Sequence, residues 1–257
     1  MKKRINAAGY DVDKARNVGL LDSYQECFES LTDKEIKLLE LGVLYGASLK
    51  MWRDYFEKGI IVGLDLNVVD VDDPTGRIRV YQGSQRDTKL LDRIAYEQAP
   101  EGFDVVIDDC SHIGRFTRTS FWHLFDNHLK PGGIYVIEDY GTGYMDDWPD
   151  GKGYNRRPRS PCSWLSSLKD DVVESILSRL ATFSPIKLPK LFLIFTMSRS
   201  IPSHNYGMAG FVKELIDACC LGEIVSPNRG SGRYRPYKIQ RIHIFWNHVI
   251  VFKSVKL

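Results

Sequence analysis

The chain lacks the features that mark secreted, membrane-spanning and thiolate-rich proteins. It has 257 residues and only 5 cysteines. With an odd number and no CxxC pair, neither a disulfide framework nor a thiolate zinc site is expected. Its apolar runs, such as 191–195 and 242–246, fall far short of the roughly 20 residues that cross a bilayer. The basic first residues are not followed by the apolar stretch of a signal peptide. We therefore expect a cytoplasmic protein with no membrane partner.

An excess of charge of one sign is also missing. Lysine and arginine number 35 against 33 aspartates and glutamates, for a net charge of +2, so nothing points to nucleic acid as a partner. Hydrophobic residues make up 43% and charged residues 26% of the chain, which is ordinary for a globular protein. The length suits one α/β domain with additions and leaves a homo-oligomer open.

Short apolar runs alternate with helical patterns between Ser23 and Ile137. That rhythm is typical of parallel strands joined by crossover helices. The runs show no strict polar alternation, as expected for strands that are covered on both faces. The expected strands are 37–41, 60–65, 78–82, 103–108 and 133–138, and the expected helices between them are 48–56, 88–98 and 115–129. The segment LKPGG at 129–133 is interpreted as the stop between the last helix and its strand.

The composition changes after residue 139. Residues 140–161 are rich in Gly, Pro, Asp and Arg and are expected to form a long loop, whereas 164–180 and 207–221 are expected to be helices. The tail predicts two strands that form a hairpin around Asn247 and His248. The predicted fold class is α/β, with a mostly parallel sheet, helices on both faces and a C-terminal antiparallel hairpin that closes one edge.

The turn after the first expected strand carries two glycines. In open α/β sheets, ligands bind beyond the carboxyl ends of the strands, and Gly42 and Gly46 permit a sharp turn close to a ligand. A dinucleotide fingerprint would need a glycine where Leu44 stands, so a pyrophosphate ligand is disfavoured. Glu40 would repel a phosphate but attract the ammonium of a methionine-like group. A plain strand-to-helix turn is the alternative interpretation.

Polar residues also follow the second and third expected strands. Asp65 lies 19 residues after Gly46, close to the spacing at which a carboxylate holds a ribose diol. Ser84 and Gln85 offer small and amide groups to an adenine edge. Each is equally typical of a helix cap when taken alone, but together they indicate an adenosine ligand without a pyrophosphate. The residues predicted to bind it are Glu40, Gly42, Tyr45, Gly46, Ser48, Asp65, Leu66, Ser84, Gln85 and Asp108.

The fourth and fifth expected strands both end in carboxylates. Asp108 and Asp109 close the fourth strand shortly before His112, and Glu138 and Asp139 close the fifth. Asp109, Glu138 and Asp139 can converge, and three like charges in one place need a cation to offset their repulsion. An all-oxygen set favours Mg²⁺, Ca²⁺ or Mn²⁺ over zinc. Asp108 points to the other side of the strand end, where it can contact the methionine end of the ligand or cap a turn.

Five motifs together carry a family resemblance. LLELG (38–42), GASLKMW (46–52), IVGLD (61–65), VIDDCSH (106–112) and LKPGGIYVIED (129–139) resemble the macrocin-type sugar O-methyltransferases of natural-product biosynthesis, which are class I S-adenosylmethionine-dependent enzymes. The resemblance covers 23–144 and the C-terminal hairpin. It implies a seven-stranded Rossmann-like fold, S-adenosyl-L-methionine and Mg²⁺ or another divalent cation as cofactors, and a glycoside with a vicinal diol as the acceptor.

The same resemblance implies roles for individual residues. Asp109, Glu138 and Asp139 would be the Mg²⁺ ligands and His112 the general base; the site is also similar to that of catechol O-methyltransferases, which have a lysine at the position of His112. Tyr144, just after the metal pair, is expected to touch the acceptor.

We expect one methyltransferase domain over 1–257, made of an arm (1–22), a cofactor-binding core (23–139), a substrate lid (140–205) and a C-terminal helix with the hairpin (206–257).

The sequence departs from the family pattern in three places. The turn is GVLYG at 42–46, and Ser84 stands where many methyltransferases have an aspartate beside the adenine. Residues 140–205 match no family segment, so the acceptor is not identified.

Two histidines outside the motifs, His123 and His128, lie on the expected helix 115–129 and are interpreted as surface or interhelical groups. Cys110 is interpreted as a small buried filler rather than a nucleophile.

The expected chemistry explains why a cation and a base occur together. An alkyl hydroxyl has a pKa of about 15.7 and a histidine one of about 6.5, so unaided deprotonation is uphill by roughly 12 kcal/mol. A divalent cation stabilises the alkoxide and orients it. We expect methyl transfer to a sugar hydroxyl. Three alternatives remain open: a catechol or phenol O-methyltransferase, an NAD-dependent oxidoreductase that uses Asp65, and a non-catalytic nucleoside-binding protein.

Overall fold

The fold is known for most of the chain. The computed structural model describes residues 3–10, 14, 19–145, 147–155, 206–224 and 238–255. The helix expected at 164–180 and most of the lid expected at 140–205 lie outside the described residues. The division of the chain into arm, core, lid and C-terminal part therefore stays a prediction.

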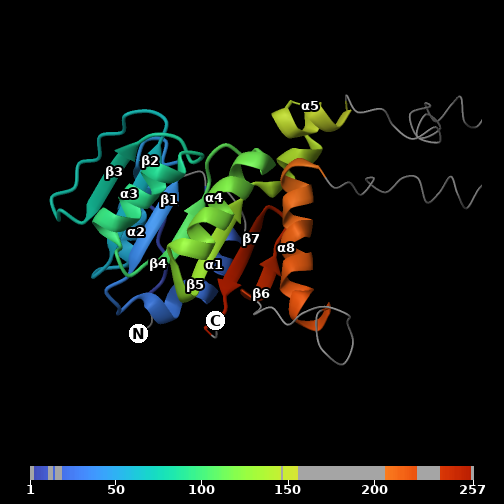
Figure 1. Ribbon diagram of the computed structural model, residues 1–257. Coiled ribbons are helices and arrows are strands. Elements are labelled where there is room, and N and C mark those ends of the chain that lie inside the picture. Colours follow the sequence, from blue (N-terminus) through green and yellow to red (C-terminus); the bar gives the residue numbers. More distant parts are fainter. Residues whose placement is uncertain are drawn as a thin grey trace, which may run out of the picture.

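The core of the molecule is a seven-stranded sheet with strand order β3-β2-β1-β4-β5-β7-β6 (Figure 1). The first five strands are parallel, and β7 pairs antiparallel with both β5 and β6. Their bounds are β1 Lys37–Leu41, β2 Ile60–Asp65, β3 Ile78–Gln82, β4 Phe103–Asp108, β5 Leu129–Glu138, β6 Ile239–Ile244 and β7 His248–Lys253. The predicted fold class and C-terminal hairpin are confirmed.

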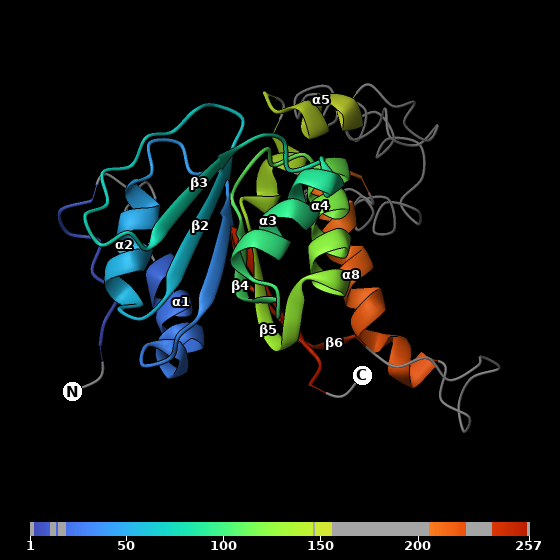
Figure 2. The ribbon, with the colours of Figure 1, turned by 60° about the vertical axis from the view of Figure 1, so that its left-hand side comes forward.

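Helices cover both faces of the sheet. They are α1 Leu20–Phe28, α2 Ala47–Tyr55, α3 Thr88–Gln98, α4 Gly114–Asn127, α5 Pro149–Asn155 and α8 Gly207–Ile224, with short 3₁₀ turns η2 Glu29–Leu31 and η3 Tyr140–Tyr144. Figure 2 shows α1 and α2 on one side of the sheet and α3, α4 and α8 on the other. None of the helices in the described residues is long and apolar enough to cross a membrane.

Two apolar cores result, because alternate side chains of each strand point to opposite faces. In β1, Leu38 packs on the side of α1 and α2, whereas Leu39 packs on the side of α3 and α4. Aromatic side chains fill the first core around Trp52 and the second around Phe121. Burial on both faces explains why the strands read as continuous apolar runs without polar alternation.

Two segments differ from the secondary structure predicted from the sequence. β5 begins at Leu129 rather than at 133. Its pairing with β4 jumps from Leu129 to Ile134, so the proline and glycines between them fall in an irregular stretch where no ladder bond is lost. The expected loop 140–161 contains η3 and α5. The carboxylate of Asp150 accepts hydrogen bonds from the amides of Gly114 (2.8 Å) and Met208 (2.9 Å), contacts that no local pattern reveals.

Candidate active site

A cavity of about 730 Å³ lies at the carboxyl ends of the parallel strands, a volume within the range of small-molecule sites. Its walls come from the turns that follow β1, β2, β3 and β4. Seven of the ten residues predicted to bind an adenosine ligand line it: Gly42, Tyr45, Ser48, Asp65, Leu66, Ser84 and Gln85. The strand ends thus assemble the predicted site at the predicted edge of the sheet.

The glycines of the first turn are needed for contacts within the protein. Gly42 has φ +83°, and a Cβ there would lie 2.2 Å from the backbone oxygen of Asp109. Gly46 has φ +76°, and its Cβ would lie 2.4 Å from Cγ2 of Val71. Both positions therefore require glycine for close packing and backbone conformation. The turn is held against the end of β4, so the cavity wall that it forms lies beside Asp109.

Asp65 orders the same turn. One carboxylate oxygen accepts hydrogen bonds from the amides of Val43 (3.0 Å) and Leu44 (3.1 Å), and the other accepts one from the amide of Asn67 (2.9 Å). The carboxylate therefore ties the turn after β1 to the end of β2. Its predicted contact with a ribose diol stays a prediction, and a ribose would share these oxygens with the backbone.

Asp108 lies beneath the cavity and is not among its lining residues. It is 2% exposed and accepts hydrogen bonds from Ser120 Oγ (2.8 Å), Gln85 Nε2 (3.1 Å) and the hydroxyl of Tyr135 (3.2 Å). Burial raises its pKa, and these donors oppose the rise. Asp108 thereby positions Gln85, which does line the cavity, so its predicted contact with the ligand would be indirect.

Three of the predicted metal and base residues come together at one corner of the cavity. Asp109, His112 and Asp139 each bring a ligand atom within 4.8 Å of the other two. His112 Nε2 lies 3.8 Å from Asp109 Oδ1 and 3.9 Å from Asp139 Oδ2. Asp109 follows β4 directly and Asp139 follows β5 directly, so adjacent parallel strands produce this convergence.

The backbone is strained at this corner. His112 has φ 50° and Asp139 has φ 51°, and Leu44 in the turn beside the cavity also has φ 50°. These are the non-glycine residues with positive φ in the described part of the chain. Such conformations cost of order 1–3 kcal/mol each and cluster at functional sites. His112 is held in place because its carbonyl accepts a hydrogen bond from Thr142 Oγ1 (3.0 Å) and its ring packs edge-on against Trp148, with centroids 5.5 Å apart.

The fourth predicted residue, Glu138, is not part of this group. Its Oε1 accepts hydrogen bonds from the hydroxyl of Tyr24 (2.5 Å) and from Lys14 Nζ (2.7 Å). Lys14 also binds Asp109 and lies 3.4 Å from Glu40 Oε1. It is 2% exposed. A lysine from the N-terminal arm therefore supplies the positive charge among three of the carboxylates in the structure.

Electrostatics explain why this lysine stays charged. Burial acts against the ammonium of Lys14, but Asp109, Glu138 and Glu40 outweigh it and raise its pKa well above the ordinary value. Burial also raises the pKa of Asp109 and of Glu138, and Lys14 opposes both shifts. Burial and then Glu138 raise the pKa of Tyr24, so its hydroxyl remains a hydrogen-bond donor.

Glu40, predicted to bind the ligand, is not among the residues that line the cavity. Its side chain is fully buried and accepts a hydrogen bond from Ser48 Oγ through Oε2 (2.8 Å). Oε1 is buried without a hydrogen bond from any described residue; the ammonium of Lys14 stands 3.4 Å away. Buried acceptors normally have a donor at hydrogen-bond distance. In the structure the cation that faces this oxygen is the ammonium of Lys14.

Sequence reasoning missed several residues of the site. Lys14 and Tyr24 lie outside every motif, and Arg86 and Phe116 line the cavity with a guanidinium 4.3 Å from the ring centroid. Conversely, Tyr144 is 40% exposed and is not among the lining residues, so its predicted contact with an acceptor stays a prediction. Cys110, interpreted as a buried filler, is only partly buried and lines the cavity, and burial raises the pKa of its thiol.

Comparisons with known proteins agree with this geometry. No family model matches the chain. It is 40% identical over 175 residues to mycinamicin VI 2''-O-methyltransferase of Micromonospora griseorubida and 37% identical over 160 residues to demethylmacrocin O-methyltransferase of Streptomyces fradiae. These matches cover 65% and 60% of this chain, and 41% and 38% of the relatives. The chain is a homologue of the macrocin-type sugar O-methyltransferases.

A solved structure extends the likeness to nearly the whole chain. The mycinamicin-pathway methyltransferase MycE, in complex with Mg and SAH, superposes with a TM-score of 0.69 and 30% identity over 98% of this chain and 55% of its own. A second MycE structure, with Mg, SAH and mycinamicin VI, gives a TM-score of 0.67. The sheet is thus that of a class I methyltransferase. The chain spans about half the length of these relatives.

Proposed function

We propose that the chain is an S-adenosylmethionine- and Mg²⁺-dependent O-methyltransferase that acts on a sugar hydroxyl of a glycosylated natural product. The observation that carries the proposal is the convergence of Asp109, His112 and Asp139 beside a 730 Å³ cavity at the carboxyl ends of the strands. The similarity of the chain to two sugar O-methyltransferases of antibiotic pathways supports it.

The cavity fits the cofactor by the chemistry of its walls. Behind the wall, Glu40 accepts a hydrogen bond from the lining residue Ser48, and its buried Oε1 would suit the ammonium of the methionine end in place of Lys14. Asp65 stands at the end of β2, where a ribose is held in this fold class, and Ser84 and Gln85 offer hydrogen-bonding groups to the adenine. No glycine-rich pyrophosphate cradle accompanies them, which favours a nucleoside with a cationic tail over a dinucleotide.

The carboxylates fit a hard divalent cation. Asp109 and Asp139 would hold it through oxygen, the donor that Mg²⁺ prefers, and Glu138 would join them once it releases Lys14. In this site a bound cation supplies charge stabilisation for an alkoxide and chelation of a vicinal diol. Burial raises the pKa of Asp109, and the charge of Glu138 raises it further; this repulsion is the physical reason that a cation belongs here.

His112 is the proposed general base. Its side chain is 13% exposed at the cavity wall; the hydrogen bond from Thr142 holds its backbone carbonyl, and the ring packs against Trp148. Nε2 faces the two aspartates, so it can accept the proton of a hydroxyl held between them. A fixed base of this kind contributes on the order of 10²–10⁴ in rate.

The experiment is methyl transfer from labelled S-adenosylmethionine to a panel of desmethyl glycosides that carry vicinal diols. Transfer should require Mg²⁺, stop in EDTA, and fall by at least about 100-fold in His112→Ala. His243→Ala, on the edge strand β6, is the matched control and should keep full activity. Undiminished turnover in EDTA, or in His112→Ala, would contradict the proposal.

A further inference from the structure

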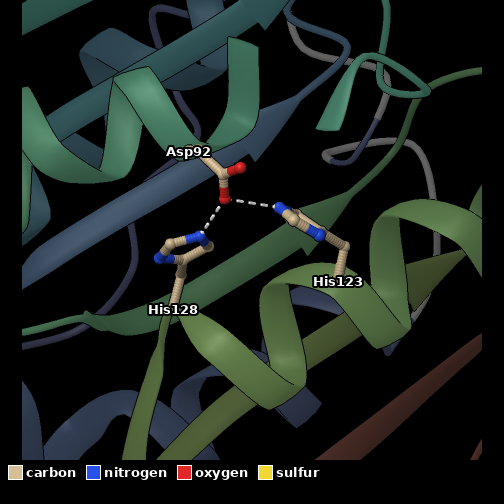
Figure 3. A group of neighbouring side chains, drawn as sticks. All are labelled: Asp92, His123 and His128. Atoms are coloured by element: carbon tan, nitrogen blue, oxygen red, sulfur yellow. Dashed lines mark hydrogen bonds and ion pairs between the residues drawn. The ribbon is translucent and has the colours of Figure 1, made fainter. Parts of the chain in front are cut away.

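A second cluster of ligand-type side chains lies between α3 and α4. Asp92 on α3 faces His123 on α4 and His128 at the end of that helix (Figure 3). The backbone oxygen of His128 accepts a hydrogen bond from the amide of Phe103 at the start of β4 (2.7 Å). Because α4 runs about 20 Å from Gly114 to its end, the cluster lies near the amino ends of the strands, at the opposite edge from the candidate active site.

Both imidazoles point at one carboxylate oxygen. Asp92 Oδ1 lies 2.7 Å from Nε2 of His123 and 2.6 Å from Nε2 of His128, and the ring centroids are 5.4 Å apart. An ionised carboxylate accepts only, so both Nε2 atoms donate a hydrogen to it. Among the described residues, Oδ2 of Asp92 has no hydrogen-bond partner. One ligand atom from each of the three residues lies within 4.8 Å of the others.

Packing fixes the two histidines and leaves the carboxylate accessible. The side chains of His123 and His128 are 19% and 21% exposed, whereas that of Asp92 is 52% exposed. The imidazoles are therefore held in position by the surrounding helices, and the aspartate can move by rotating its side chain. An ion can enter from solvent without unfolding α3 or α4, and solvent can complete its coordination.

We propose that Asp92, His123 and His128 bind a transition-metal ion of the zinc type. Two imidazole nitrogens with one carboxylate oxygen suit Zn²⁺ and Co²⁺, and this nitrogen-rich set disfavours Mg²⁺. Tetrahedral zinc with bonds of about 2.0–2.1 Å keeps its ligand atoms roughly 3.3 Å apart. Asp92 Oδ1 need only withdraw by less than about 1 Å from each nitrogen, a shift within reach of its exposed side chain.

The proton balance of binding is simple. Each neutral imidazole shifts its proton from Nε2 to Nδ1 and offers the freed Nε2 lone pair to the ion. Asp92 loses its hydrogen bonds from His123 and His128 and gains one bond to the metal ion. An ion at this point would join α3 to α4 and so hold together the helical layer over β4 and β5. The proposal does not depend on methyl transfer, because none of its residues belongs to the candidate active site.

Zinc titration calorimetry of the metal-stripped chain tests this site, with Co²⁺ absorption in the visible range as a second readout. His123→Gln and His128→Gln should each weaken one zinc-binding event by at least about 10-fold and remove the corresponding Co²⁺ band. His243→Gln lies outside both clusters and should bind like the unmodified chain. His112→Gln distinguishes this site from any ion bound at the candidate active site. This variant should leave zinc binding at His123 and His128 unchanged.

The outcomes separate the proposal from simpler explanations. Loss of one zinc equivalent in His123→Gln and in His128→Gln, with folded variants by circular dichroism, supports it. Identical stoichiometry, affinity and Co²⁺ spectrum in the unmodified chain and in His123→Gln would overturn it, and the cluster would then be a hydrogen-bonded link between helices. Neither result alters the prediction for methyl transfer, which is read from His112→Ala.

Discussion

Lys14 Nζ lies 2.7 Å from Oε1 of Glu138, although 124 residues separate them in the chain. The pair is buried and extends to Asp109 and Glu40. Three carboxylates in one buried place are tolerable only with compensating positive charge. In the structure this charge comes from the protein itself, at the corner where the proposed function requires a divalent cation.

The first prediction follows from that relationship. Lys14→Met should lower the free energy of unfolding in EDTA by about 3–5 kcal/mol, because it leaves buried carboxylates without their partner. Mg²⁺ should raise the melting temperature of this variant more than that of the unmodified chain, since the cation can replace the missing ammonium. Melting curves with and without Mg²⁺ measure both effects.

A matched control is available on the same arm. Lys3 is paired with Glu57, whose side chain is 74% exposed, so Lys3→Met should cost less than about 1 kcal/mol and leave the response to Mg²⁺ unchanged. If Lys14→Met is no more destabilising than Lys3→Met, the interpretation of Lys14 as a buried counter-charge is wrong.

His248 predicts how stability depends on pH. Burial lowers its pKa from 6.5 to about 4, while its ring stacks on Phe245 and its two nitrogens bond to Ser23 (2.6 Å) and Asn247 (2.7 Å). Between these pH values the unfolded chain binds a proton that the folded chain does not. The free energy of unfolding should therefore fall as pH drops from 6.5 to 4, by at most about 1.4 kcal/mol per unit.

Denaturant unfolding at several pH values measures this slope. His248→Gln removes the titrating group. It should therefore reduce the fall in the free energy of unfolding between pH 6.5 and about 4, whatever its effect on stability at neutral pH. His243→Gln, on the neighbouring strand, should retain the decline. An unchanged slope in His248→Gln would show that other groups cause the acid sensitivity.

Two glycines separate the effect of crowding from that of backbone conformation. Gly42 and Gly76 both have positive φ, but a Cβ on Gly42 would meet the Asp109 backbone at 2.2 Å, whereas one on Gly76 would meet nothing within 4 Å. Gly76→Ala should cost about 1 kcal/mol. Gly42→Ala should cost at least about 2 kcal/mol more, because backbone atoms must move. Equal costs in thermal unfolding would mean that the turn after β1 relaxes freely.

The sequence predicted the strands well because their cause is local. Four of the five expected parallel strands have the predicted bounds, and each is a run of five or six mostly apolar residues without strict polar alternation. The convergence of Asp109 and Asp139 could be predicted as well, because neighbouring parallel strands end at the same edge of a sheet. The homology to sugar O-methyltransferases and the class I methyltransferase fold, inferred from the motifs, are confirmed.

The parts that the sequence did not predict depend on distant contacts. Lys14 reaches Asp109 and Glu138 across 95 and 124 residues, and no spacing rule connects them. The direction of Glu138 follows from that lysine and from Tyr24 on α1. Helix α5 lies in a segment rich in glycine, proline and aspartate, and Asp150 ties it to α4 and α8. In each case tertiary contacts outweigh local preference.

The most direct measurement of the central claim is calorimetric titration of the chain with S-adenosylhomocysteine and, separately, with NAD. It requires no knowledge of the acceptor. We expect one molecule of S-adenosylhomocysteine to bind per chain, with affinity reduced in Glu40→Gln because the buried acceptor for the ammonium loses its charge, and no binding of NAD. Binding of NAD in place of S-adenosylhomocysteine, or of neither, would contradict the account.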